Sequence, residues 1–377
     1  MSNTIGLLSD LIAIDSVNPS LVPGGAGEQN IAEAVAQHLR ESGLDVSLSE
    51  ISEGRQNVVG VIEGRERGKS LMLCGHSDTV GVEGMDHPFD PVERDGKIYG
   101  RGSGDMKGGL AAILDAARAL AAGGWPKGRL IVAAVADEEY ASIGAEALVK
   151  DWSADAAIVT EPTGLVVATG HKGFSWVEVT TEGRAAHGSR PQEGRDAILK
   201  MGSVLQKLGA LTRKLESRSP HALLGCPSLH ASLIDGGREM STYPDKCVLK
   251  IERRTLSDED RGIALREVEE ILNCLRQEDK EFVGAARLLF DRSPYETPAD
   301  SELPGLLEQT IKTAGRETRR EGMTYWTDAA ILGHAGIPSV VFGPGGEGFH
   351  GLEEYVLVDQ VLACRDVLTQ FARDFCE

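Results

Sequence analysis

Histidine and acidic side chains follow the ends of four separate apolar runs of this sequence. They are His76 and Asp78 after 71–74, Asp137-Glu138-Glu139 after 130–136, Glu161 after 156–160, and His350 after 337–342. A fifth segment, at 100–109, places Asp105 in a glycine-rich turn. In an open α/β sheet, sites form beyond the carboxyl ends of the strands, so we expect all five segments to meet in one crevice. Clustered acids repel one another unless a cation compensates their charge, which indicates a metal centre.

The ligand types narrow the choice of metal. A mixture of imidazole and carboxylate groups favours zinc or a neighbouring transition ion, because all-oxygen sets are typical of magnesium and calcium. Two histidines and three acids can hold two ions, ~3.5–4 Å apart, if one carboxylate bridges them. Glu138 and Glu139 are adjacent and point different ways, so one can bind metal while the other acts as a general base.

Two other functions are suggested by short motifs, and the residues argue against both. Gly75-His-Ser77-Asp-Thr79 approaches the G-x-S-x-G elbow of serine hydrolases, but the elbow needs glycine where this chain has Thr79. The glycines at 100–109 suggest a dinucleotide-binding loop, but they lack the G-x-G-x-x-G spacing, and Asp105 would face a phosphate. We therefore assign the chemistry of the first stretch to His76 and not to Ser77.

The elements that must position these residues alternate between strands and helices. Apolar runs predict strands over 58–62, 71–74, 130–136, 156–160 and 337–342. Helical spacing of apolar residues predicts helices over 4–14, 29–43, 110–122, 143–150, 310–314 and 359–375. Strands separated by helices are typical of a mostly parallel sheet that is flanked by helices.

A different pattern begins near residue 173. The segment 174–181 alternates between apolar and polar residues, as a half-buried antiparallel strand does. Further strands are predicted at 228–234 and 247–253, with helices at 196–208 and 258–276. We therefore predict an α/β fold with a catalytic domain at 1–172 and 293–377, and an inserted, smaller α+β domain at 173–292.

The bulk composition excludes several partners. The chain has 377 residues and a net charge of −19, which argues against binding to nucleic acid or to an anionic membrane surface. No apolar run approaches the ~20 residues that span a bilayer, and we expect no signal peptide because the first ten residues lack a basic segment. Six scattered cysteines without a C-x-x-C pair fit reduced thiols, so we expect a cytoplasmic protein.

Six motifs occur in one order along the chain. They are His76-x-Asp78, the glycine-rich segment with Asp105, Asp137-Glu-Glu139, Glu161-Pro-Thr163, Ala186-His187-Gly-Ser-Arg-Pro191, and Gly343-Pro-Gly345 followed by His350. Together they resemble the di-zinc metallopeptidase family of acetylornithine deacetylase, succinyl-diaminopimelate desuccinylase, aminoacylase-1 and glutamate carboxypeptidase. The resemblance runs from Ser16-Val-Asn-Pro19, near the N-terminus, to the end of the chain.

The resemblance implies a role for each residue of the cluster. His76 and Glu161 would bind one Zn²⁺, Glu139 and His350 the other, and Asp105 would bridge, with Co²⁺ or Mn²⁺ as possible substitutes. Glu138 would be the general base, and Asp78 would orient His76 through its far ring nitrogen. The family also has a cis peptide bond after the bridging aspartate, here Asp105–Met106.

The inserted segment resembles the lid of the family, which also forms a dimer interface, so the resemblance implies a homodimer. His187 would stabilise the oxyanion, and Arg254 would bind a substrate carboxylate. His230 is a further substrate-binding candidate because it lies on a predicted lid strand. The family has asparagine where this chain has Ser241, so we expect its substrate pocket to differ.

The implied activity is the metal-dependent hydrolysis of an amide bond in a small N-acyl amino acid, by a water that bridges the metals. The same residues would serve a dipeptidase or a glutamate-type carboxypeptidase, since the lid pocket decides the substrate. A catalytically silent binding protein on the same fold is a further alternative. It would be favoured by the loss of a ligand or of the base, and none is lost.

Overall fold

The computed structural model describes residues 3–125 and 127–376, and the chain divides into two compact units. Unit 1 consists of Met1–Gly170, Glu296–Glu321 and Thr327–Glu377, and unit 2 of His171–Tyr295 and Gly322–Trp326. None of the helices in the described residues combines the length and the apolar character that a membrane span requires.

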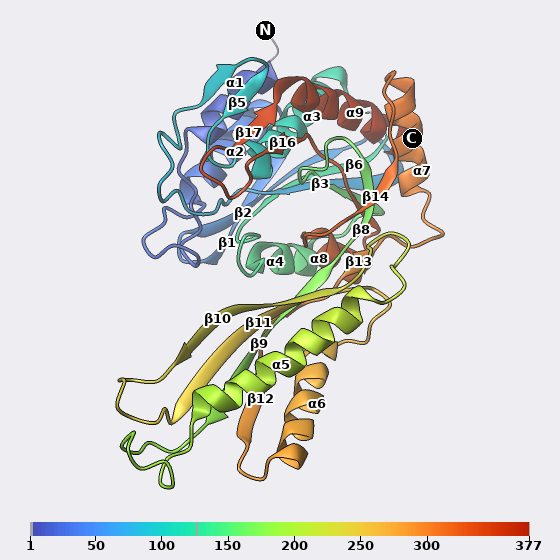
Figure 1. The fold of residues 1–377 in the computed structure, drawn as a ribbon. Coiled ribbons are helices and arrows are strands. Elements are labelled where there is room, and N and C mark those ends of the chain that lie inside the picture. Colours follow the sequence, from blue (N-terminus) through green and yellow to red (C-terminus); the bar gives the residue numbers. More distant parts are fainter. Residues whose placement is uncertain (1–2, 126, 377) are drawn as a thin grey trace. The chain divides into compact units, whose positions relative to one another are not determined.

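The centre of unit 1 is a nine-stranded mixed sheet (Figure 1). Its order is β1 (Asp45–Ser52), β2 (Arg55–Glu63), β6 (Lys127–Val135), β3 (Glu66–His76), β7 (Ala156–Val159), β15 (Ser339–Val341), β8 (Val167–His171) and β13 (Tyr295–Glu296), with β14 (Arg320–Met323) paired to β8. The inner strands β6, β3, β7 and β15 run parallel to one another. The pairs β1–β2, β2–β6 and β15–β8 are antiparallel. The predicted mostly parallel, helix-flanked sheet is therefore confirmed.

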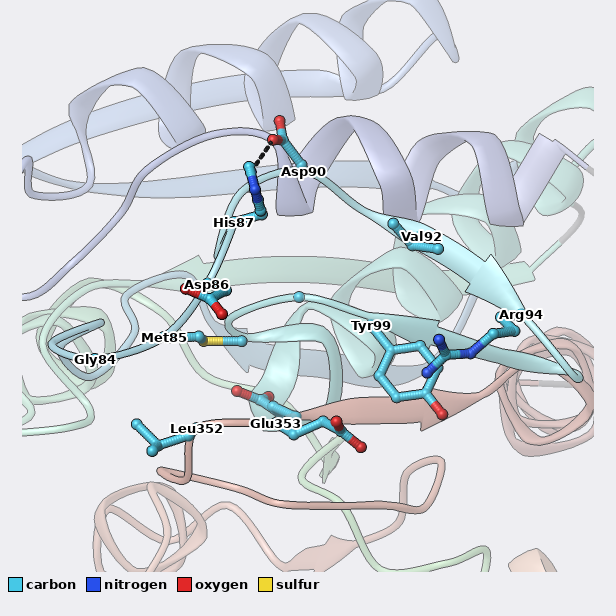
Figure 2. Close-up of a pocket in the computed structure, with 12 residues that line it drawn as sticks. Gly84, Met85, Asp86, His87, Asp90, Val92, Arg94, Tyr99, Leu352 and Glu353 are labelled. Carbon is cyan, nitrogen blue, oxygen red and sulfur yellow. Dashed lines mark hydrogen bonds and ion pairs between the residues drawn. The ribbon is translucent and has the colours of Figure 1, made fainter.

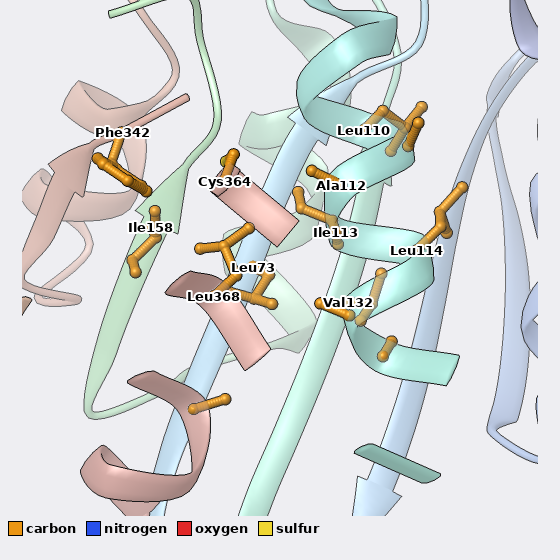
Figure 3. Packing of buried hydrophobic residues seen from close by; sticks show 14 of the residues in the cluster. Leu73, Leu110, Ala112, Ile113, Leu114, Val132, Ile158, Phe342, Cys364 and Leu368 are labelled. Atoms are coloured by element: carbon orange, nitrogen blue, oxygen red, sulfur yellow. The ribbon is translucent and has the colours of Figure 1, made fainter. Parts of the chain in front are cut away.

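Helices cover both faces of this sheet (Figure 1). α1 (Asn3–Ile12), α2 (Gln29–Glu41), α3 (Gly108–Gly123), α7 (Leu303–Thr313) and α9 (Val358–Cys376) contribute to one apolar core, while α4 (Ile143–Asp151) packs with α8 (Ala329–His334). Figure 3 shows part of this core, with Leu110, Ile113 and Leu114 on α3 and Leu73, Val132 and Leu368 among the other members of the cluster. The parallel strands read as continuous apolar runs because they are buried on both faces. The core thus fixes the ends of β3, β6 and β7, where the predicted ligands lie.

A small sheet of unit 1 joins two loops that are distant in sequence. Its order is β16 (Gly346–Glu347), β17 (Tyr355–Leu357), β5 (Lys97–Tyr99) and β4 (Val92–Arg94). β17 pairs antiparallel with β5, and β5 leads into the π-helical turn η1 (Ser103–Lys107). This pairing brings the loop that carries His350 toward the loop that carries Asp105.

Unit 2 is a four-stranded antiparallel sheet with two helices, as the predicted α+β unit requires. The sheet order is β10 (Ser228–Gly236), β11 (Lys246–Thr255), β9 (Gly173–Glu182) and β12 (Val283–Arg292), and the helices are α5 (Ala197–Glu216) and α6 (Ile263–Glu278). Alternate residues of β9 and β11, such as Val177 and Ile251, pack against these helices. The side chains of the intervening residues therefore point to the opposite face of the sheet.

Several predicted bounds were wrong. The helix predicted from 258 begins at Ile263, because Glu259 accepts a hydrogen bond from the amide of Leu256 in a turn, and Gly262 has a φ of 74°. The helix predicted to end at 208 continues to Glu216, and the one predicted at 310–314 begins at Leu303. Strand β12 was not predicted, since its sequence does not alternate between apolar and polar residues.

Candidate metal centre

The five predicted ligands converge, with Asp105 at their centre. One carboxylate oxygen of Asp105, Oδ1, lies 3.1 Å from Nε2 of His76, and the other, Oδ2, lies 3.4 Å from Nε2 of His350. Nε2 of His76 is also 3.7 Å from Oε1 of Glu161, and Nε2 of His350 is 3.1 Å from Oε2 of Glu139. Asp105 thus offers one oxygen to each of two histidine–glutamate pairs, which is the geometry of a bridging ligand.

Glu138 joins the same cluster from the His76 side. Its Oε2 lies 4.0 Å from Nε2 of His76. Two groups of residues each have potential ligand atoms that all lie within 4.8 Å of one another. One group is His76, Asp105 and Glu139, and the other is His76, Glu138 and Glu161. Geometry alone therefore leaves two roles open to Glu138, a free carboxylate and a ligand.

Burial and the charges of neighbouring groups shift the pKa of each ionisable side chain in the cluster. Burial raises the pKa of Glu138 and of Glu161 well above the usual range, and the negative charge of Glu161 adds to the effect on Glu138. Burial and the charge of Asp105 raise the pKa of Glu139 to about 7. Hydrogen bonds to Asp105 and Glu139 raise the pKa of His350 to about 10. The three glutamates therefore resist ionisation, whereas hydrogen bonds from His350 and His76 lower the pKa of Asp105 between them.

The donor set fits divalent transition ions. Oε1 of Glu139 and Oε1 of Glu161 are buried, and neither has a hydrogen-bond partner in the part of the chain that the structure describes. A buried carboxylate oxygen without a donor is rare, and a cation satisfies it. Together with two imidazoles and Asp105, these oxygens form the mixed nitrogen and oxygen set that zinc prefers.

Asp78 fixes the turn that carries the two glutamates. Its carboxylate accepts hydrogen bonds from the amides of Glu138 (3.1 Å) and Glu139 (3.2 Å) and from Nδ2 of Asn18 (2.8 Å). Nδ1 of His76 lies 3.0 Å from the main-chain oxygen of Asp78 and 3.5 Å from its Oδ1. Asp78 therefore lies beside Nδ1 of His76, and its carbonyl oxygen is the nearer acceptor.

The same turn rests on a buried ion network that sequence reasoning missed. Arg55 donates to both carboxylate oxygens of Glu28, and its Nη2 lies 2.8 Å from Oδ1 of Asp137. Asp137 also accepts from Asn18 (3.0 Å), which ties the network to the Asp78 side of the site. All four side chains are buried. The partners lie far apart in sequence, so their spacing gave no signal.

Replacement of Arg55 by methionine tests this network. We expect Arg55→Met to lower the free energy of unfolding by about 3–5 kcal/mol, because it leaves the carboxylates of Glu28 and Asp137 buried without their cation. Urea unfolding measures the change. Arg319→Met is the matched control, since Arg319 pairs with Glu321 at the surface with 72% of its side chain exposed, and it should leave stability unchanged. Equal losses in both variants would contradict the proposed role of Arg55.

Glu354 holds the glycine-rich loop around Asp105. Its carboxylate accepts hydrogen bonds from the amides of Gly102 (3.0 Å), Gly104 (2.9 Å) and Asp105 (3.0 Å), and from Nη1 of Arg101 (2.6 Å). The predicted cis peptide bond between Asp105 and Met106 is present. Glu354, which sequence reasoning also missed, therefore sets the position of the central ligand.

A cavity of about 440 Å³ lies beside Glu354 (Figure 2). It is lined by the 84–100 region, including Asp86, His87, Arg94 and Tyr99, and by 352–354. The guanidinium of Arg94 stacks over Tyr99, and His87 pairs with Asp90. None of the predicted ligands lines this cavity, so it is distinct from the metal centre.

The three predicted lid residues belong to unit 2, and each has its own local surroundings. His187 is exposed, and its Nδ1 lies 2.8 Å from Oγ of Ser189. His230 is exposed on β10. Nε of Arg254 donates to Oε1 of Glu252 at 2.6 Å.

The chain belongs to peptidase family M20/M25/M40, whose model matches residues 72–374. An acetylornithine deacetylase from Vibrio atlanticus (strain LGP32) is 30% identical over 380 residues, which cover 97% of each chain. Aminopeptidase PepT from Bacillus cereus has a similar fold, with a TM-score of 0.81 and 17% identity over 99% of this chain and 98% of that one. The protein YXEP from Bacillus subtilis, described as a dinuclear metal-binding peptidase of the M20 family, has a TM-score of 0.75 and 15% identity over 99% of this chain and 97% of that one. The predicted family is confirmed, and the chain is a hydrolase of this family.

Proposed function

We propose that this protein is a two-metal amidohydrolase that removes the acyl group from an N-acyl amino acid. The observation that carries the proposal is the position of Asp105, with one oxygen toward His76 and the other toward His350. Glu161 would complete one ligand set and Glu139 the other. Zn²⁺ suits these donors, with Co²⁺ or Mn²⁺ as substitutes. When bound, two such ions polarise a carbonyl and lower the pKa of water.

Glu138 is the carboxylate that remains for proton transfer. In the proposed reaction it takes a proton from the attacking water, the oxygen of that water bonds to the acyl carbon, and the carbon–nitrogen bond breaks. Glu138 then gives the proton to the leaving amine. Its buried place supports this role, because burial raises the pKa of its carboxyl and makes it a better proton carrier.

We assign 1–172 and 293–377 to the catalytic part and 173–292 to a lid. His187 would donate a hydrogen bond to the oxyanion, and Arg254 would bind the carboxylate of the substrate, with His230 as a further contact. The planar fork of a guanidinium matches a carboxylate, and the side chain of Arg254 is 30% exposed. The unpaired cysteines fit a reducing compartment, so we place the protein in the cytoplasm.

The lid would also bind a second copy of the chain. β10 is an edge strand, paired within its sheet only with β11, and it exposes Leu233 (64%) and Ile234 (57%). Leu199, on α5 of the same unit, is 72% exposed. An exposed apolar edge strand is a template for pairing, and a two-fold dimer would cover it with the same strand of its partner.

We expect the double variant Leu233→Asp and Ile234→Asp to be a monomer where the parent chain is a dimer, since like charges would face each other at the two-fold contact. Sedimentation velocity gives the mass of each species. Leu352→Asp is the control, because Leu352 is 67% exposed but lies in unit 1. A parent chain that is monomeric, or a double variant that stays dimeric, would contradict the proposed interface.

A substrate panel tests the proposed activity. Zinc- and cobalt-loaded protein is assayed for amine release from N-acetyl, N-succinyl and N-aroyl amino acids and from unblocked dipeptides. We expect release from the acylated compounds, because two relatives that are 30% identical over 97% and 99% of this chain are named as acetylornithine deacetylases. Release from dipeptides alone would indicate a peptidase with the same chemistry. Two bound metals without any turnover would favour a binding protein.

A further inference from the structure

The face of the lid sheet that α5 and α6 leave open carries a regular set of charged and aromatic side chains. In the strand register, Phe174 of β9 lies between Arg254 of β11 and Arg292 of β12. In the next row on the same face, Trp176 lies between Glu252 and Phe290, and Glu252 pairs in turn with His230. Side chains that are directly opposite across strands point to the same face, so these rows form one surface.

The aromatic rings of this surface pack against one another. Ring centroids lie 5.4 Å apart for Phe174 and Trp176, 5.5 Å for Trp176 and Phe290, and 5.8 Å for Phe174 and Phe290. Trp326 meets Phe174 edge-on at 6.3 Å. The sequence has only four tryptophans, and two of them lie here. All four rings are partly exposed, so the cluster is not a closed core.

One carboxylate links the aromatic rings to a cation. Oε2 of Glu252 accepts a hydrogen bond from Nε1 of Trp176 at 2.9 Å, while its Oε1 accepts from Nε of Arg254. The guanidinium of Arg254 stacks 5.3 Å from the ring centre of Phe174. Its two terminal nitrogens have no hydrogen-bond partner among residues 3–125 and 127–376. Arg254 is therefore held in place with a free edge for an anion, next to an aromatic floor.

We infer that this surface binds a carboxylate together with an aromatic ring, so that the preferred substrates are N-acyl amino acids that carry an aromatic group. The inference rests on the proposed function, in which Arg254 binds the substrate carboxylate. The ring would stack on Trp176 and Phe290, either from an aroyl group or from the amino-acid side chain. A cationic side chain is disfavoured here, because Arg254 and Arg292 flank the first row.

Calorimetric binding to a Glu138→Gln variant tests the inference without turnover. The probes are N-benzoylglycine, N-acetylphenylalanine and N-acetylglycine, which share a carboxylate and differ in the presence and place of a ring. We expect one of the two aromatic probes to bind about tenfold more tightly than N-acetylglycine. Which of them does so shows where the ring is carried.

Added substitutions separate stacking from structure. Trp176→Ala should bring the favoured probe to within about twofold of N-acetylglycine, whereas Trp176→Phe should keep most of the preference, because a ring remains. Phe290→Ala is a second test if Trp176→Ala does not fold, as judged by thermal unfolding. Trp152→Ala is the control, since Trp152 stacks with Arg129 in unit 1.

In the binding assay the inference is overturned by equal affinity for all three probes, by no measurable binding of any probe, or by an equal loss for all probes in Trp176→Ala. Amine release from non-aromatic substrates without an aromatic preference would reject this inference and keep the proposed function. Tight binding of an aromatic probe without amine release in the parent protein would keep the binding surface and reject the proposed function.

Discussion

Glu138→Gln slows amide hydrolysis by orders of magnitude and leaves two metals bound per chain. We expect kcat to fall by about 10²–10⁴-fold, which is the contribution of a positioned general base. Glutamine keeps the size of the side chain but cannot accept and return a proton. The amide of residue 138 still donates to Asp78, so the turn that carries Glu139 stays in place. Steady-state kinetics and metal analysis by mass spectrometry on the same sample give both numbers.

The metal content separates the two roles that geometry leaves open to Glu138. If its carboxylate were a ligand together with His76 and Glu161, the variant would lose one metal along with its activity. Glu317→Gln is the control, because Glu317 is exposed and outside the cluster. Turnover near that of the parent protein would refute the assignment of Glu138 altogether.

The convergence of the candidate ligands could be predicted because they lie at or beyond strand ends. His76 is the last residue of β3, and Glu139 and Glu161 lie in the segments that follow β6 and β7. The carboxyl ends of such parallel strands share one edge of the sheet. The residues that hold those candidate ligands in place could not be predicted from the sequence. Glu354 is 249 positions from Asp105, and Arg55 is 82 positions from Asp137, so only the folded chain brings them together. Spacing along a sequence records local geometry and carries nothing about such pairs.

Unit 2 illustrates the same limit. The alternation of 174–181 predicted a half-buried strand, and the burial of every second residue of β9 confirms it. Phe290 lies on β12, whose residues show no alternation, and a register shift between Leu288 and Phe290 decides which ring meets Trp176. The aromatic surface therefore depends on a strand register that hydrophobic pattern alone does not set.

Asp105→Asn removes both metals. Asparagine has one carbonyl oxygen and an amide nitrogen that carries two hydrogens, so it cannot offer an acceptor to each of two ions. The oxygens of Asp105 lie toward His76 and His350, and we expect loss at either side to weaken the other, because the remaining carboxylates would again crowd without a cation. Metal analysis after dialysis should find two ions in the parent chain and less than one in the variant.

His350→Asn gives the comparison that makes this result specific. His350 contacts Asp105 and Glu139 and lies on the far side from Glu161, so its loss should cost one ion and leave the His76 side filled.

Metal removal by a chelator should lower the melting temperature of the parent chain, since ions that bind only the folded state stabilise it by about 2.7 kcal/mol at one hundred times Kd. Asp105→Asn should show no such shift. If Asp105→Asn kept one ion as firmly as His350→Asn, Asp105 would be a ligand of a single metal and the bridging arrangement would be wrong.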